Sequence, residues 1–148
     1  MITERFTVTT NWHKDEFENS KSHLGSIDGK ASLEISAAPK FKGDATAYNP
    51  EDLLLSALAS CHFMSYQYVC KQAGIELLSY RSKTTGIIEV EGTGAGAFTS
   101  ITISPEMVIS DSSDRELALE LHHKAHELCF IANSLSCGVA IEPAVTFK

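Results

Sequence analysis

Apolar side chains are densest between Leu53 and Val69, where they occupy almost every angular position of a helix. The residues just before this run favour a helix start. Asn49 is a good cap, Pro50 sits where a helix tolerates proline, and two acids follow near the positive end of the helix dipole. Nothing interrupts the pattern before Gly74. The sequence therefore predicts one long core helix that is buried on most of its sides.

Alternating apolar and polar residues predict two strands before this helix, over 4–12 and over 31–36. The segment between them, 14–30, is polar and contains Asp28-Gly29, which is typical of a tight turn. We therefore expect a pair of strands joined by a polar connection, followed by a loop that leads into the long helix.

Two further segments, 77–91 and 98–109, predict a β-hairpin because branched apolar residues recur in both and glycines separate them. These glycines do not predict a nucleotide site, since a phosphate cradle must open a helix and here a second strand follows. Ser113 and Glu116 have the spacing of a capping box and predict the start of a second, amphipathic helix. The chain closes with a strand over 139–147 that is interrupted by a proline.

The order of these elements, ββ-α-ββ-α-β, predicts an α+β fold with an antiparallel sheet. A length of 148 residues suits a single domain over 1–148. The net charge of −7 is spread over mixed acids and bases, which argues against nucleic-acid binding. No basic-then-apolar leader opens the chain and polar residues interrupt its most apolar run, so we expect no membrane association, a cytoplasmic protein and reduced cysteines.

Cys61, near the middle of the long helix, is the first candidate for chemistry. Free cysteine is among the most buried residue types, so a small hydrophobic role accounts for Cys61 taken alone. The helix N-terminus is too distant to lower the thiol pKa, and apolar surroundings would raise it. Reactivity would therefore need a cation or a hydrogen-bond donor from another element.

The other three cysteines differ in how well they could pair with Cys61. Cys70 lies nine residues further along the same helix, about 13 Å along its axis, so the two cannot form a disulfide within the chain. Cys129 lies at the end of the second predicted helix, which can pack against the first, so it is a plausible partner. Cys137 follows shortly afterwards and could compete.

His122 and His126 lie four residues apart on one face of the second predicted helix, a spacing that zinc sites use. The second histidine of the zinc-protease pattern is absent, and no other segment supplies obvious further ligands. The sequence therefore favours exposed histidines on a solvated helix face. It predicts neither a metal nor an organic cofactor.

Two segments together carry a family resemblance, and each includes one of the cysteines above. They are Asn49-Pro50-Glu51-Asp52-Leu53-Leu54 with Ser60-Cys61, and Ala125-His126-Glu127-Leu128-Cys129-Phe130-Ile131-Ala132-Asn133-Ser134. On these residues the chain resembles the OsmC/Ohr family of osmotically induced and organic-hydroperoxide-resistance proteins. The resemblance implies thiol peroxidases that form intertwined homodimers, with long central helices wrapped by sheets and two sites at the subunit interface.

The resemblance also implies roles for three residues. Cys61 matches the peroxidatic cysteine, Cys129 the resolving cysteine, and Glu51 the glutamate that orients an activating arginine. Glu51 cannot serve Cys61 of its own helix, because the two residues lie about 15 Å apart along the helix axis. The Glu51 of a partner subunit could take this role. The proline common after the family's second cysteine is absent, since Phe130 stands there.

The family's activating arginine has no counterpart in the polar segment 14–30. The cationic side chains that could replace it are Lys21, Lys30, His23 and Arg5. A lysine offers a point charge without the planar fork that bridges a carboxylate and a peroxide oxygen. We therefore expect a divergent branch of the family.

The resulting prediction is a peroxidase that reduces organic hydroperoxides. Cys61 becomes a sulfenic acid, Cys129 condenses with it to a disulfide, and an external dithiol reductant restores both thiols. Two other classes stay open: a non-catalytic dimer that binds a small apolar ligand, and a thiol redox sensor. A catalyst turns over peroxide with excess dithiol, a sensor oxidises once and changes its partner binding, and a binding protein does neither.

Overall fold

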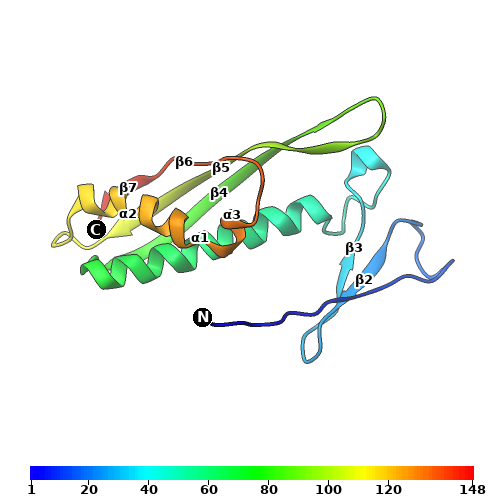
Figure 1. The fold of residues 1–148 in the computed structure, drawn as a ribbon, viewed down its shortest axis with the longest axis horizontal. Coiled ribbons are helices and arrows are strands. Elements are labelled where there is room, and N and C mark those ends of the chain that lie inside the picture. Colours follow the sequence, from blue (N-terminus) through cyan, green and yellow to red (C-terminus); the bar gives the residue numbers. More distant parts are fainter. The chain divides into compact units, whose positions relative to one another are not determined.

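The computed structural model describes all 148 residues, which divide into two compact units, Met1–Leu54 and Leu55–Lys148. The long helix α1 (Pro50–Ala73) begins in the first unit, and most of its length belongs to the second. The α+β class predicted from the element order is confirmed (Figure 1). A single domain over 1–148 stays a prediction.

The first unit contains a three-stranded antiparallel sheet of β1 (Thr9–Asn11), β2 (His23–Ser26) and β3 (Leu33–Ile35), in that order. A short 3-10 helix, η1 (Pro39–Phe41), follows. The strand predicted over 4–12 is therefore reduced to three residues. Phe6 and Val8 pair with no strand, and their side chains are exposed.

Strand β2 lies within the segment that the sequence predicted as a connection. It has only four residues and includes Gly25, so it is too short to show an alternating pattern. The tight turn predicted at Asp28-Gly29 is present between β2 and β3, and Gly29 has a φ of 78°. This left-handed backbone favours glycine, because a side chain would be strained there.

Helix α1 has the bounds that the sequence predicts. The Asn49 side chain caps it, with Oδ1 accepting from the N–H of Asp52 at 2.8 Å. At the other end Gly74 has a φ of 75°, and the N–H of Ile75 donates to the carbonyl of Cys70 at 2.9 Å. This pattern is a Schellman cap, which requires a left-handed residue after the helix.

The chain covers only one face of α1, in contrast to the prediction of a helix buried on most sides. The buried side chains recur at helical spacing and are Leu58, His62, Tyr66, Val69 and Cys70. On another face Met64 and Tyr68 are 58% and 57% exposed. An apolar sequence pattern all around a helix does not distinguish faces covered by the same chain from faces that it leaves open.

The second unit is built on a long hairpin of β4 (Leu77–Val90) and β5 (Gly96–Ile109), as predicted. The closing strand is split into β6 (Val139–Ile141) and β7 (Ala144–Phe147), and both pair with β5 in parallel. The sheet is therefore mixed, whereas the sequence predicted an antiparallel sheet. The parallel pairing follows from the helical crossover that brings the chain back to β5 in the same direction.

Helix α2 (Arg115–Leu128) begins one residue later than the predicted capping box implies. The cap is Asp114, whose Oδ1 accepts from the N–H of Leu117 at 3.1 Å. The Ser113 hydroxyl instead accepts from the N–H of Glu76 at 3.0 Å, which joins this loop to the start of β4. A further short helix, α3 (Phe130–Asn133), was not predicted.

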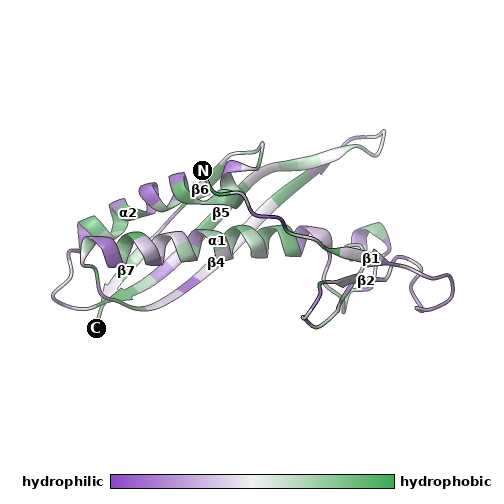
Figure 2. Ribbon diagram, turned by 60° about the horizontal axis from the view of Figure 1, so that its bottom comes forward, coloured by the Kyte–Doolittle hydropathy of each residue, from purple (hydrophilic) through white to green (hydrophobic).

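The core of the second unit lies where both helices pack on the hairpin, and α1 runs alongside β4 and β5 (Figure 1). Its buried residues are Tyr66, Val69, Cys70, Ile75, Met107, Ile109, Ala118, Ala125 and Val145. Figure 2 shows hydrophobic residues recurring along α1, and both hydrophilic and hydrophobic residues on α2. No helix combines the length and the apolar character needed to cross a membrane.

Candidate functional site

The structure brings Cys61 of α1 next to Cys129, at the junction of α2 and α3. Cys61 is partly exposed, whereas Cys129 is fully buried. The Cys129 sulfur caps α3 by accepting from the N–H of Ala132 at 3.5 Å. Both cysteines are free thiols, and neither Cys70 nor Cys137 is paired with them.

Burial raises the pKa of the Cys129 thiol to about 11, because the thiolate would lose its hydration. The N–H of Ala132 acts in the opposite direction, and the neighbouring Cys61 thiol raises the pKa further. Cys129 is therefore protonated at neutral pH. Burial also raises the pKa of Cys70, which lies in the core.

Cys61 opens onto an apolar hollow of about 350 Å³. The residues that line it are Cys61, Met64, Ser65, Tyr68, Leu128 and Phe130. Phe130 is 81% exposed and follows Cys129 directly, at the position where the sequence departs from the family pattern. The hollow can accept the hydrocarbon part of a small molecule beside the thiol.

Glu51 lies in the first turn of α1, within the first unit. It forms no ion pair, since the single salt bridge of the structure joins Lys124 to Glu127 at 3.2 Å. The candidate activating cations also belong to the first unit and are Arg5, Lys21, His23 and Lys30. A carboxylate–cation pair of the kind that the resemblance implies is thus not formed within this chain.

The residue after Cys61 forms a buried contact that the sequence did not suggest. His62 Nε2 lies 3.0 Å from Nδ1 of His122, and the two rings are 12° from coplanar. His122 Nε2 lies 3.3 Å from the Met107 sulfur. Tyr66 stacks on the His122 ring at a centroid distance of 3.8 Å. His122 is only 3% exposed, so the prediction of an exposed histidine is wrong at this position.

Burial lowers the pKa of both histidines, because the protein interior disfavours the imidazolium. The pKa of His62 falls to about 4, with His126 as a second, electrostatic cause. The pKa of His122 falls to about 3, and there His62 is the second cause. The pair is therefore neutral at physiological pH, and its contact is a hydrogen bond between uncharged rings.

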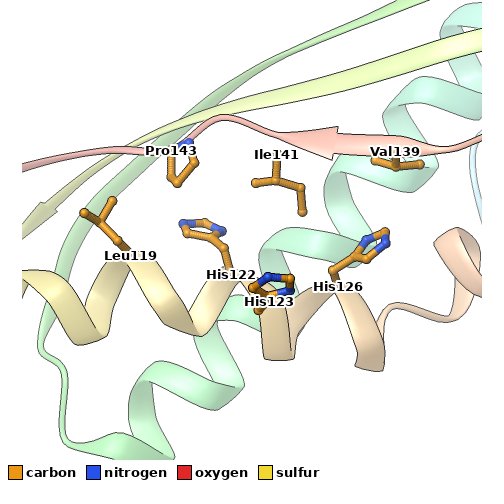
Figure 3. Close-up of a pocket in the computed structure, with 7 residues that line it drawn as sticks. All are labelled: Leu119, His122, His123, His126, Val139, Ile141 and Pro143. Atoms are coloured by element: carbon orange, nitrogen blue, oxygen red, sulfur yellow. The ribbon is translucent and has the colours of Figure 1, made fainter.

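A second cavity, of about 230 Å³, lies between α2 and the strand β6. Its lining residues are Leu119, His122, His123, His126, Val139, Ile141 and Pro143. Figure 3 shows the three imidazoles separated along α2 rather than converging on one point. Consistent with this, no three histidine, cysteine or carboxylate side chains are grouped so that they could hold a metal ion.

The sequence analysis did not single out His62, although a signal for its burial was present. Leu58, His62 and Tyr66 recur at intervals of four residues, the spacing of one helical face. That pattern places the side chain on the face of the core. Its partner, His122, lies 60 residues away and could be identified only from the packing of the two helices.

The fold agrees with comparisons to known proteins. The model of the family described as OsmC-like protein matches residues 43–144. The chain therefore belongs to the OsmC family. It is 24% identical to the uncharacterized protein YmaD of Bacillus subtilis, over all of this chain and 97% of YmaD.

Two further relatives extend this result. The organic hydroperoxide resistance protein OhrB of Bacillus subtilis is 31% identical over 72% of this chain and 76% of its own length. A solved OsmC-like protein of unknown function from Vibrio cholerae has a TM-score of 0.84 and 25% identity, over 95% of this chain and 99% of that one. The OsmC-like fold inferred from the sequence is confirmed.

Proposed function

We propose that this protein is a cysteine peroxidase that reduces organic hydroperoxides, with Cys61 as the peroxidatic and Cys129 as the resolving cysteine. The observation that carries the proposal is the pairing of a partly exposed thiol at an apolar hollow with a buried, protonated thiol beside it. The similarity to an organic hydroperoxide resistance protein supports the same reaction.

The reaction begins at Cys61. Its thiolate attacks the distal peroxide oxygen and the O–O bond breaks, so that with one proton the products are an alcohol and a Cys61 sulfenic acid. The protonated Cys129 thiol then condenses with the sulfenic acid. The sulfur–sulfur bond forms, and the hydroxyl of the sulfenic acid leaves with the thiol proton as water. An external dithiol reduces the disulfide by exchange, and no metal or organic cofactor takes part.

The hollow supports an organic substrate rather than hydrogen peroxide. Met64, Tyr68 and Phe130 provide an apolar surface on the approach to Cys61. An alkyl or aryl group gains free energy when it leaves water for such a surface, about 25 cal/mol for each Å² of apolar area buried. Hydrogen peroxide has no such group.

The proposal includes a homodimer in a cytoplasmic setting. The face of α1 that carries Met64 and Tyr68 stays open in the single chain. Burying this face against a second copy would remove apolar surface from water. It would also allow Glu51 of one chain to act near Cys61 of the other, through a cation such as Lys21, Lys30, His23 or Arg5, because Glu51 cannot reach Cys61 of its own helix.

The hollow also favours a second candidate, a protein that binds a small apolar ligand without chemistry. Steady-state consumption of an organic hydroperoxide in the presence of excess dithiol separates the two. We expect turnover that is lost in Cys61→Ser and retained in the matched control Cys137→Ser. A parent protein that consumes no hydroperoxide, or a Cys61→Ser variant with full activity, would overturn the peroxidase. A single oxidation without turnover would instead indicate a redox sensor.

A further inference from the structure

Three contacts join α1 to α2 along one seam, and the thiol pair is one of them. Cys61 lies beside Cys129, His62 bonds to His122, and the Tyr66 hydroxyl donates to the carbonyl of Ala118 at 2.7 Å. The contacts ascend along α1 as they descend along α2, so the helices run in opposite directions at the seam. The histidine pair is the contact next to the thiols.

The protons of this pair can be assigned from the contact at its buried end. The thioether of Met107 has no hydrogen to donate, so the His122 Nε2 that faces it must carry the proton. His122 Nδ1 is then a hydrogen-bond acceptor. His62 Nε2 must therefore be protonated and donate to it, which leaves a bare lone pair on His62 Nδ1. That atom is buried and has no hydrogen-bond partner in the chain.

This arrangement holds the two rings in one geometry. An N–H···N bond at 3.0 Å between two nearly parallel rings is directional, and the Tyr66 ring lies 6° from parallel to His122 and covers its face. Turning either ring over would break the hydrogen bond between the rings or take the His122 Nε2 proton away from the Met107 sulfur. A buried donor left without an acceptor costs about 1–3 kcal/mol, so the alternatives are unfavourable.

We propose that His62 is a positioning residue for disulfide formation. Its bond to His122 holds the turn of α1 that carries Cys61 against the middle of α2, seven residues before Cys129, so that the Cys61 sulfur stays within reach of the Cys129 thiol. This inference rests on the proposed function for its consequence in catalysis. The geometry it describes governs any reaction that joins the two sulfurs.

The consequence is a choice between two fates of the Cys61 sulfenic acid. In the first, the Cys129 thiol attacks it, and the products are a disulfide and water. In the second, another hydroperoxide molecule oxidises it, and the products are a sulfinic acid and an alcohol. Only the first fate can be reversed by a dithiol. Loosening the seam slows the first reaction and leaves the second unaffected, since the second does not involve Cys129.

The test compares His62→Leu, which removes both ring nitrogens, with His62→Gln, whose amide nitrogen can replace Nε2 as the donor to His122. Ile109→Val serves as a stability control, because it removes one methyl group from the core of the second unit, and Ile109 takes part in none of the three seam contacts. His122→Phe provides a second way to break the bond and keeps a ring for Tyr66 to stack on. Far-UV circular dichroism checks that each variant folds.

Two measurements are made on each variant. Mass spectrometry after a pulse of organic hydroperoxide gives the ratio of Cys61–Cys129 disulfide to Cys61 sulfinic acid. We expect a fall of at least about fivefold in His62→Leu and His122→Phe, and values near the parent in His62→Gln and Ile109→Val. Equilibration with a glutathione redox buffer should show a disulfide weaker by about tenfold, which corresponds to about 30 mV, in the first two variants.

The glutathione measurement needs no peroxide, so it separates this inference from the proposed function. A parent protein that does not consume hydroperoxide overturns the function alone. Parent-like disulfide stability in both His62→Leu and His122→Phe overturns the positioning role. Equal losses in Ile109→Val would also overturn it, because the effect would then follow general stability rather than the seam.

Discussion

The Nε2 atom of His62 lies 3.0 Å from the Nδ1 atom of His122, and both side chains are almost completely removed from water. The bond joins the two helices that carry the candidate thiols, one residue after Cys61 and seven residues before Cys129. It also makes the fold sensitive to acid, because burial disfavours the charged form of both rings.

The first prediction concerns stability at low pH. The folded-state pKa values of about 4 and about 3 lie below the value near 6.5 of an unfolded histidine, so the unfolded chain binds protons first as the pH falls. The contribution of the two histidines to the free energy of unfolding is therefore fully present above pH 6.5 and decreases as the pH falls from there towards 4. Each proton that only the unfolded state binds contributes a slope of about 1.4 kcal/mol per pH unit.

Denaturant titrations at pH 7, 6 and 5 measure this slope. His62→Gln keeps a donor towards His122 and removes one titrating group, so its loss of stability over this range should be smaller than that of the parent. Equal slopes in the two proteins would show that the acid sensitivity arises elsewhere.

The second prediction concerns the disulfide. Mild treatment with an organic hydroperoxide should link Cys61 to Cys129 within one chain, because Cys70 is buried in the core and Cys129 is the neighbouring thiol. Peptide mapping under non-reducing conditions identifies the bridge. In Cys129→Ser, sulfinic acid should accumulate on Cys61. A dominant bridge between Cys129 and Cys137 would rule out the assignment.

The third prediction concerns assembly. A face of α1 that leaves Met64 and Tyr68 more than half exposed is unfavourable in water, so we expect a homodimer. Light scattering at low micromolar concentration should give about twice 16.1 kDa. Met64→Lys together with Tyr68→Lys should shift the protein towards the monomer. A well-folded parent monomer at this concentration would contradict both the dimer and a site shared between subunits.

The fourth prediction concerns Glu51. If Glu51 orients a cation beside the partner's thiol, Glu51→Gln should slow the single-turnover oxidation of Cys61 by at least about tenfold, a barrier change of about 1.4 kcal/mol. The carboxylate must act through the cation, because by itself it would disfavour the thiolate. As a mere helix-start acid, its loss would cost a few tenths to about 1 kcal/mol of stability and leave the rate unchanged.

The melting temperature measured beside the rate distinguishes these outcomes. Asp52→Asn is the matched control, since it removes the neighbouring acid of the same helical turn. An unchanged rate in Glu51→Gln with a small fall in melting temperature would leave Glu51 as a residue that only stabilises the helix start.

The elements that could be predicted from the sequence are those whose bounds depend on residues close together in the chain. The bounds of α1 follow from Asn49 and Gly74, because a capping side chain and a left-handed glycine act within a few residues of themselves. The hairpin of β4 and β5 was also predicted, because its two strands are neighbours in the chain and are joined by a short glycine-rich turn. The start of α2 differs by one residue from the prediction, because the Ser113 hydroxyl accepts from the N–H of Glu76, which lies 37 residues away in the sequence.

The sequence by itself determined the order of the main elements, the long central helix and the two cysteine segments that carry the resemblance to the OsmC/Ohr family. Only the tertiary structure decided which face of α1 is covered, that β6 and β7 run parallel to β5, and that His122 is buried against His62. Periodicity in the sequence indicates that a helix has an apolar face, but which segment covers that face depends on packing between distant parts of the chain. For the same reason the Cys129 pKa of about 11 could not be predicted, because its largest cause is burial, which depends on how distant segments pack around the thiol.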